Sequence, residues 1–131
     1  MIYGIGVDLV SIDRIDTVIG RWGDRFLRRV FTPFEIETCK RRAFPASAFA
    51  LRFAAKEAFS KALGLGMRKG LKWRDIETFN HPGGKPDLRL YGRSLEICQN
   101  TGITGIYLSL SDDGGYAVAM VVMERPDENE S

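Results

Sequence analysis

The sequence has little cysteine, little histidine and no long apolar run, and each scarcity excludes a class of protein. Two cysteines and one histidine among 131 residues provide neither a disulfide framework nor the paired ligands of a zinc site. The longest apolar run, Ala117 to Met123, has seven residues, whereas a membrane-spanning helix needs about 20. We therefore expect no membrane partner. No signal peptide is visible at the N-terminus, so we expect a reducing, cytoplasmic location.

Composition and length indicate one ordinary globular domain. The chain is 44% apolar and 27% charged, which excludes the disordered, collagen-like and coiled-coil classes. Its length fits a single domain, and we expect that domain to span residues 1–125. The remaining segment, 126–131, is acidic and is expected to fray.

The net charge of +2 hides an uneven distribution. Residues 1–75 hold 15 Lys and Arg against 8 Asp and Glu, whereas residues 76–131 hold 4 against 9. A basic half favours an anionic partner, which could be a phosphate, a nucleic acid or an acidic protein. A basic face that is merely solvated explains the charge alone equally well.

Apolar periodicity and turn residues predict an α+β domain, with an antiparallel sheet packed against a long central helix and shorter helices. A strand is expected over 2–10, where Gly4 and Gly6 either weaken the strand or allow another backbone to approach closely. Ser11 and Thr32 are expected to cap helices, the latter in a capping box with Glu35. Further helices are expected over 45–63 and 93–100, and further strands over 73–80, 87–91, 106–111 and 116–124.

The helix predicted from Pro45 to Leu63 is rich in alanine and apolar almost all round, so it should be central and largely buried. At 100° per residue, Glu57 falls among small apolar neighbours. It does not fall on the charged side of the helix, where Arg52 and Lys56 are expected.

Asp8 and Glu57 are acids within otherwise apolar elements. An ionised carboxylate in an apolar strand is costly unless it is paired or binds a metal. Taken singly, Asp8 could cap the next helix, and Glu57 could pair with Lys61 at i, i+4. The glycine-rich basic loop over 64–70 changes this balance, because such a loop can hold phosphate. Mg²⁺ takes one or two carboxylates and leaves its other positions to water and phosphates, so the combination favours phosphoryl transfer on a diphosphate.

Three other motifs carry weaker signals. His81 adjoins a Pro-Gly-Gly turn and is expected to be a loop residue rather than a base. Asp112 and Asp113 are expected to form a hairpin turn with the two glycines that follow. Gly84-Lys85-Pro86 either contacts phosphate or simply connects two strands.

Two motifs make the chain recognisable. The first is Gly4-Ile5-Gly6-Val7-Asp8-Leu9-Val10. The second, which places Glu57 49 residues after Asp8, is Arg52-Phe53-Ala54-Ala55-Lys56-Glu57-Ala58-Phe59-Ser60-Lys61-Ala62-Leu63-Gly64. With these motifs the chain resembles the phosphopantetheinyl transferases, and most closely their small single-domain type, the holo-acyl-carrier-protein synthases. The resemblance continues through residues 73–77, 84–86 and 108–111, so it covers nearly the whole chain.

The resemblance implies a Mg²⁺-dependent transfer of 4′-phosphopantetheine from coenzyme A to a serine of an apo acyl carrier protein, with release of adenosine 3′,5′-bisphosphate. It implies that Asp8 and Glu57 hold the metal and that Glu57 and Lys61 are catalytic. The residues implied to contact coenzyme A are Arg52, Lys61, Gly64, Gly84, Lys85 and Pro86. Many relatives have a histidine where this chain has Asp112, so Glu57 or a metal-bound water is left to accept the serine proton.

The resemblance also implies a homotrimer with active sites between protomers, in which a neighbour supplies residues 84–86. The acidic carrier protein is expected to meet arginines on and just after the first helix, namely Arg14, Arg21, Arg25 and Arg28. Two other functions stay open: a non-catalytic relative that binds coenzyme A or carrier protein, and a small nucleic-acid-binding domain. The trio of Asp8, Glu57 and Lys61 argues against the first. Acidic residues between the arginines argue against the second, so we expect no nucleic acid partner.

Overall fold

The computed structural model describes residues 1–127, which form an α+β fold. The expected frayed tail therefore lies mostly outside the described residues, and 125–127 follow the last strand without regular structure. In chain order the elements are β1 (Ile2–Ser11), α1 (Ile12–Trp22), α2 (Asp24–Val30), α3 (Pro33–Lys40), α4 (Pro45–Ala62), the 3₁₀ helix η1 (Trp73–Asp75), β2 (Ile76–Asn80), β3 (Pro86–Leu90), α5 (Gly92–Thr101), β4 (Gly105–Asp113) and β5 (Tyr116–Glu124).

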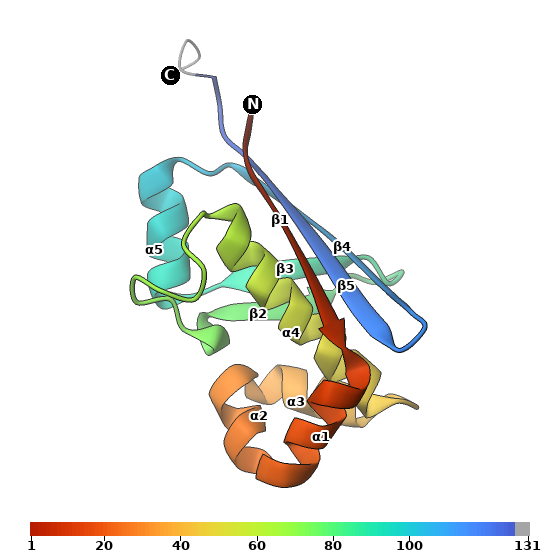
Figure 1. The fold of residues 1–131 in the computed structure, drawn as a ribbon. Helices are drawn as coiled ribbons and strands as arrows, with labels where there is room; N and C mark the ends of the chain where they lie inside the picture. The colour runs from red at the N-terminus through yellow and green to blue at the C-terminus, as the bar shows by residue number, and fades with distance from the viewer. Residues whose placement is uncertain (128–131) are drawn as a thin grey trace.

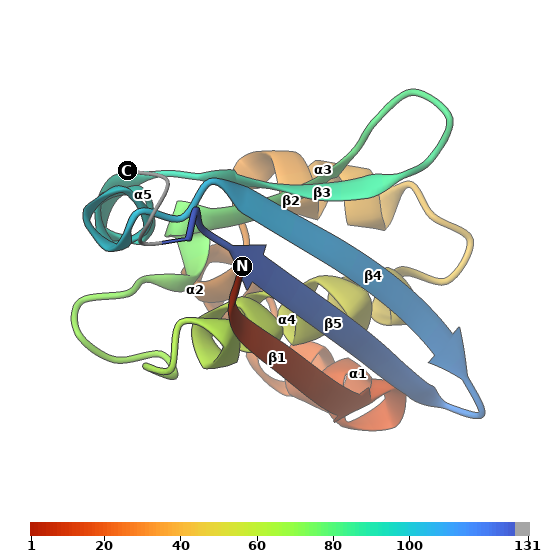
Figure 2. The same ribbon diagram turned by 90° about the horizontal axis from the view of Figure 1, so that it is seen from above.

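The strands form two antiparallel sheets where the sequence analysis expected one. A three-stranded sheet has the order β1-β5-β4, and β2 and β3 form a separate hairpin. Figures 1 and 2 show α4 lying across one face of the three-stranded sheet, with α1, α2 and α3 gathered at one end of the molecule. The hairpin lies beside β4 (Figure 2) without sharing ladder hydrogen bonds with it.

The second predicted strand begins later than expected. Residues 73–75 form η1, because the backbone turns there so that the N–H of Asp75 donates to the carbonyl of Lys72. The carbonyl of Asp75 then accepts the N–H of Tyr91 and the hydroxyl of Ser94, each at 2.8 Å. The prediction of a strand over 73–80 is therefore wrong in its first three residues.

Two glycines bring β1 and α4 into backbone contact. A Cβ on Gly4 would lie 2.0 Å from the carbonyl oxygen of Ala62, and one on Gly6 would lie 1.9 Å from that of Ala58. No side chain fits at such distances, so the close approach expected from the sequence is confirmed. Since side chains alternate along a strand, Asp8 faces α4 on the same side as Gly6.

The predicted helix caps are also confirmed. The Ser11 hydroxyl accepts the N–H of Arg14, and Thr32 and Glu35 form a reciprocal capping box. Gly23, with φ of 54°, ends α1 and starts α2. The arginines beyond residue 23 therefore belong to a separate helix, whose direction and phase differ from those of α1.

The charged side expected for α4 does not exist. Arg52 is 5% exposed and Lys56 is fully buried. The side of α4 that carries Arg52 and Lys56 is covered because the helix passes between two apolar clusters. One contains Ala54, Ala58 and Phe59 beside the sheet, and the other contains Phe49 beside the three N-terminal helices. None of the helices in residues 1–127 has the length and apolarity that crossing a bilayer would require.

Candidate active site

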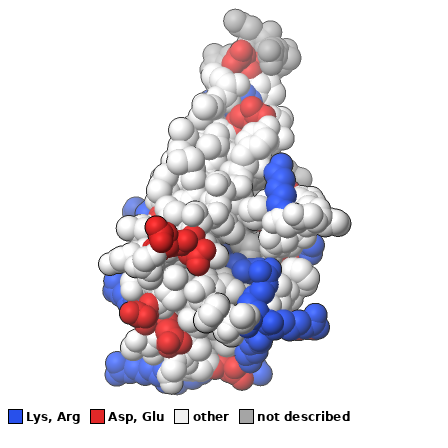
Figure 3. Space-filling view, turned by 90° about the vertical axis from the view of Figure 1, so that its right-hand side faces the viewer, with Lys and Arg blue, Asp and Glu red and all other residues white. Residues whose placement is uncertain are grey.

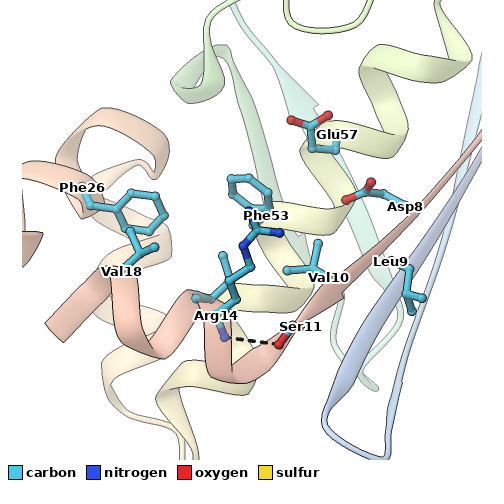
Figure 4. Close-up of a pocket in the computed structure, with 10 residues that line it drawn as sticks. Asp8, Leu9, Val10, Ser11, Arg14, Val18, Phe26, Phe53 and Glu57 are labelled. Atoms are coloured by element: carbon cyan, nitrogen blue, oxygen red, sulfur yellow. Dashed lines mark hydrogen bonds between the residues drawn. The ribbon is translucent and has the colours of Figure 1, made fainter. Parts of the chain in front are cut away.

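A cavity of about 410 Å³ opens between β1, α1 and α4. Figure 4 shows Asp8 and Glu57 at one end of it, Arg14 and Phe53 in the middle, and Val18 with Phe26 at the far end. The other lining residues are Leu9, Val10, Ser11 and Ile15. The cavity thus joins a pair of carboxylates to a largely apolar passage.

Asp8 is held by a lysine from the facing helix. The Lys61 ammonium donates to Asp8 Oδ1 at 2.8 Å and to the carbonyl of Val7 at 3.2 Å. The Asp8 side chain is 14% exposed and that of Lys61 is 48% exposed. Asp8 therefore does not cap α1, since Ser11 does. Lys61 likewise pairs across to β1 and not with Glu57 on its own helix.

Glu57 lies where its charge is disfavoured. Partial burial raises the pKa of its carboxyl group, the nearby charge of Asp8 raises it further, and Lys61 opposes both effects. Two acids that feel each other's charge in one cavity form a site where a cation is stabilised. A single lysine balances only one of the two negative charges.

This donor set fits Mg²⁺. Among residues 1–127, no group of three or more His, Cys, Asp or Glu side chains could enclose a metal ion. A cage made entirely of protein ligands, as Zn²⁺ or Ca²⁺ commonly has, is therefore absent from the described part of the chain. Mg²⁺ commonly takes one or two carboxylates and completes its octahedron with water and substrate phosphates. Asp8 and Glu57 supply that many oxygen ligands.

Not all of the predicted site residues gather at this cavity. Gly64 lies two residues after the end of α4, where its N–H donates to the carbonyl of Lys61 at 2.9 Å. Arg52 is buried on another side of α4, and its guanidinium donates to the carbonyl of Ala48 at 3.1 Å. Gly84 and Lys85 lie in the β2–β3 turn and Pro86 is the first residue of β3, and none of the three lines the cavity of its own chain.

A second groove extends the cavity over the helical surface. It has a volume of about 500 Å³ and shares Val18 and Phe26 with the cavity. Its other lining residues are Trp22, Arg25 and Arg29. The sequence analysis did not select Arg29. It counted seven residues on from Arg14 to Arg21 and seven more to Arg28, as if one helix continued through Gly23. The new helix starting at Asp24 changes the phase, and Arg28 instead approaches Asp24 Oδ2 at 3.9 Å.

The apolar wall of the cavity was also missed. Phe53 lines the cavity and stacks on Trp73 from η1, with ring centroids 5.0 Å apart and planes 20° apart. In sequence Phe53 is one more apolar residue of a buried helix. Its one signal was its place four residues before Glu57, which puts both side chains on one face of α4.

The charge at the helical end is mixed. In Figure 3, basic side chains at the lower end of the molecule are interspersed with acidic ones. Asp24 illustrates this, since it lies 3.9 Å from Arg28 and 4.0 Å from Lys40.

Comparison with known proteins identifies the family. Residues 4–121 match the 4′-phosphopantetheinyl transferase superfamily. The chain belongs to this superfamily. The match spans β1 with Asp8, α4 with Glu57 and Lys61, and most of β5, so it includes every element that builds the cavity.

Similar proteins in this superfamily share the whole fold. The chain is 48% identical over 126 residues to holo-(acyl-carrier-protein) synthase of Geobacter sulfurreducens, covering 96% of this chain and all of that protein. The crystal structure of the synthase from Neisseria meningitidis is 40% identical, with a TM-score of 0.87, and covers 95% of this chain and all of that one. The Helicobacter pylori synthase in complex with coenzyme A is 38% identical, with a TM-score of 0.81, over 92% and 99% of the two chains.

Proposed function

We propose that this chain transfers 4′-phosphopantetheine from coenzyme A to a serine of an acyl carrier protein. The observation that carries the proposal is the convergence of Asp8 from β1 and Glu57 from α4 on one cavity, with Lys61 beside them. The relatives named above are synthases of this kind, and one of them binds coenzyme A. Full-length similarity and the same fold support the same substrates here.

In this reaction the serine hydroxyl oxygen attacks the phosphorus that bears the pantetheine. The bond from that phosphorus to the bridging oxygen breaks, and adenosine 3′,5′-bisphosphate leaves. Asp8 and Glu57 would hold Mg²⁺, which would supply positive charge at the diphosphate. Lys61 is placed to donate to a phosphate oxygen once its bond to Asp8 is released. Glu57 is the group of this chain that we assign to accept the serine proton.

The carrier protein is proposed to dock on the second groove. Apolar side chains of Val18, Trp22 and Phe26 line it, and Arg25 and Arg29 flank it. An acidic helix with an apolar residue between its charges is complementary to such a groove, because the charges steer encounter and the apolar residue is buried on contact. Arg14, in the middle of the cavity, lies between the end that the cavity shares with this groove and the two carboxylates.

We propose that three copies complete the site. The face of the three-stranded sheet opposite α4 is apolar and exposed, with Ile5 at 55%, Val7 at 46%, Leu9 at 64% and Met120 at 45% exposure. An exposed apolar patch of this kind marks a protein interface. Because residues 84–86 do not reach the cavity of their own chain, a neighbouring copy is the proposed source of that turn for the nucleotide.

A turnover assay tests the function. Purified chain is incubated with coenzyme A, Mg²⁺ and apo carrier protein, and the carrier is weighed by mass spectrometry. Transfer adds one phosphopantetheine to the serine. Binding of coenzyme A without any mass gain would identify a non-catalytic relative instead. Light scattering of wild type and Leu9→Lys tests the assembly, since a monomeric wild type with full activity would contradict a site shared between copies.

We also propose a cytoplasmic location. The two cysteines, Cys39 and Cys98, are buried free thiols, and burial raises the pKa of each to about 11. Free thiols are ordinary in a reducing compartment. Fractionation of cells that produce the tagged chain would test this location.

A further inference from the structure

The residue before Glu57 is a fully buried lysine whose hydrogen bonds are all used. The Lys56 ammonium donates to Glu35 Oε1 at 2.7 Å, to the carbonyl of Trp73 at 2.9 Å and to the carbonyl of Ile76. An ammonium has three protons, and here each one has an acceptor. Lys56 and Glu35 are both 0% exposed.

Glu35 is equally well held. Its Oε1 also accepts the N–H of Thr32, while its Oε2 accepts the N–H and the hydroxyl of Thr78, both at 2.9 Å. The ion pair therefore connects three parts of the fold: α3 through Glu35, α4 through Lys56, and the η1–β2 segment through its backbone. Stability alone does not account for it, since a buried ion pair is often no more stable than apolar residues of the same size.

The opposite side of α4 meets β1 through small groups and through one partly exposed ion pair, that of Lys61 with Asp8. There the helix touches β1 through glycines and through Ala58 and Ala62. Small side chains form shallow ridges, so such a contact resists separation of helix and strand better than it resists sliding or rolling. Three directional hydrogen bonds at Lys56 add a fully buried restraint to the partly exposed one at Lys61.

Sliding or rolling of α4 against β1 would change the geometry of the proposed metal site. Asp8 comes from β1 and Glu57 from α4, so the separation of their carboxylates depends on how the helix lies against the strand. We propose that Lys56, acting through Glu35, is a positioning residue that fixes Glu57 relative to Asp8. This inference rests on the proposed Mg²⁺-dependent transfer.

The test removes the ion pair without leaving a buried charge. In Lys56→Met with Glu35→Gln, methionine fills the space of the lysine stem, and glutamine keeps an acceptor for the capping box. The Mg²⁺ concentration that half-saturates the rise in melting temperature should increase by roughly 10-fold or more, the scale seen for groups that support a metal ligand. The same shift should appear in the Mg²⁺ dependence of turnover. The KM for carrier protein should stay near the wild-type value, since α1 and α2 are untouched.

Ser94→Ala is the matched control. Ser94 is also fully buried, and its hydroxyl bonds to the carbonyls of Asp75 and Tyr91. Losing it should lower the melting temperature and leave the Mg²⁺ requirement unchanged. Thr78→Val gives a milder version of the test, because it removes one hydroxyl bond to Glu35 and keeps the ion pair. It should raise the Mg²⁺ requirement by a smaller factor, whether or not the double variant folds.

The outcomes separate this inference from the function on which it rests. If wild type responds to Mg²⁺, while Thr78→Val and a folded double variant match it in Mg²⁺ requirement and kcat, the positioning role is overturned and the proposed function stands. If the Ser94→Ala control shifts the requirement as much as these variants do, general loosening explains the effect and the inference is also overturned. A wild type without any Mg²⁺ response would overturn the metal assignment and this inference together.

Discussion

Lys61 reaches across from α4 to Asp8 on β1, 2.8 Å from its Oδ1, and leaves Glu57 on its own helix without that bond. The Lys61 ammonium is thus hydrogen-bonded to one of the two carboxylates that are proposed to hold Mg²⁺. Under the proposed function, Mg²⁺ held by Asp8 and Glu57 would compete with Lys61 for Asp8. Lys61 would then be free to donate to a phosphate oxygen of the substrate.

Replacing this lysine should separate metal binding from catalysis. In Lys61→Met the competitor for Asp8 is gone, so Mg²⁺ should bind up to about five-fold more tightly, as expected for a partly exposed ion pair. Turnover should nevertheless fall by roughly 100-fold or more, because a donor to the phosphate is lost. Calorimetric titration with Mg²⁺ beside rate measurements checks both effects. Lys72→Met, at an exposed lysine, is the control variant. Weaker Mg²⁺ binding by Lys61→Met than by wild type would refute the proposed competition between Lys61 and Mg²⁺.

The two acids should differ in their effect on stability. Glu57→Gln removes a carboxylate that is disfavoured by burial and by Asp8, so the metal-free protein should melt at a higher temperature. Asp8→Asn removes the partner of Lys61 and should give no such gain. Both should reduce turnover by about 100-fold or more if each holds the metal. Equal melting shifts, or full activity in excess chelator, would contradict this assignment.

The raised pKa of Glu57 predicts a pH dependence of stability. The folded state holds this proton more tightly than the unfolded state does. Metal-free wild type should therefore lose stability relative to Glu57→Gln as pH rises from the ordinary glutamate pKa, 4.5, through the higher folded value. Above that value the difference between the two proteins should be constant. Denaturant titrations of both proteins across this pH range measure the difference in their free energies of unfolding. If wild type gained stability relative to Glu57→Gln as pH rose, the prediction would be wrong.

Two adjacent arginines test the docking surface. Arg29 lines the groove, whereas Arg28 lies near Asp24. Arg29→Glu should raise the KM for carrier protein several-fold more than Arg28→Glu does, and added salt should weaken wild type more than Arg29→Glu. The KM for coenzyme A should change little in either variant. If Arg28→Glu instead raised this KM more than Arg29→Glu, Arg28 rather than Arg29 would contact the carrier protein.

The contact between β1 and α4 should tolerate no side chain. Gly6→Ala places a Cβ 1.9 Å from the carbonyl oxygen of Ala58, and we expect a loss of about 3 kcal/mol or more in the free energy of unfolding. A Cβ on Gly20 in α1 would meet no other atom within 4 Å, so Gly20→Ala should stabilise by roughly 0.5–1 kcal/mol. Chemical denaturation of both variants checks the pair. A neutral Gly6→Ala would mean that strand and helix are not in backbone contact.

Local rules were sufficient for much of this chain. Ser11 and Thr32 could be read as caps because a cap needs only a hydroxyl and the residues directly after it. The glycines of β1 indicated a close approach because only glycine leaves room for another backbone. The acids of the site stood out because Asp8 and Glu57 interrupt apolar elements, where an unpaired charge is costly. The resemblance to transferases rests on the same residues.

The tertiary structure decided which charges meet. Sequence spacing offered Glu57 as the partner of Lys61, but the approach of β1 to α4 provides Asp8 instead. Lys56 belonged to an exposed charged side by helical phase alone, and it is buried because α3 brings Glu35 to it from 21 residues away. Arg29 lines the groove and Arg28 does not, because Gly23 starts a new helix. Long-range packing determines which charged groups pair, because it sets their burial and their hydrogen bonds together. The spacing of residues along one helix or strand does not contain this information.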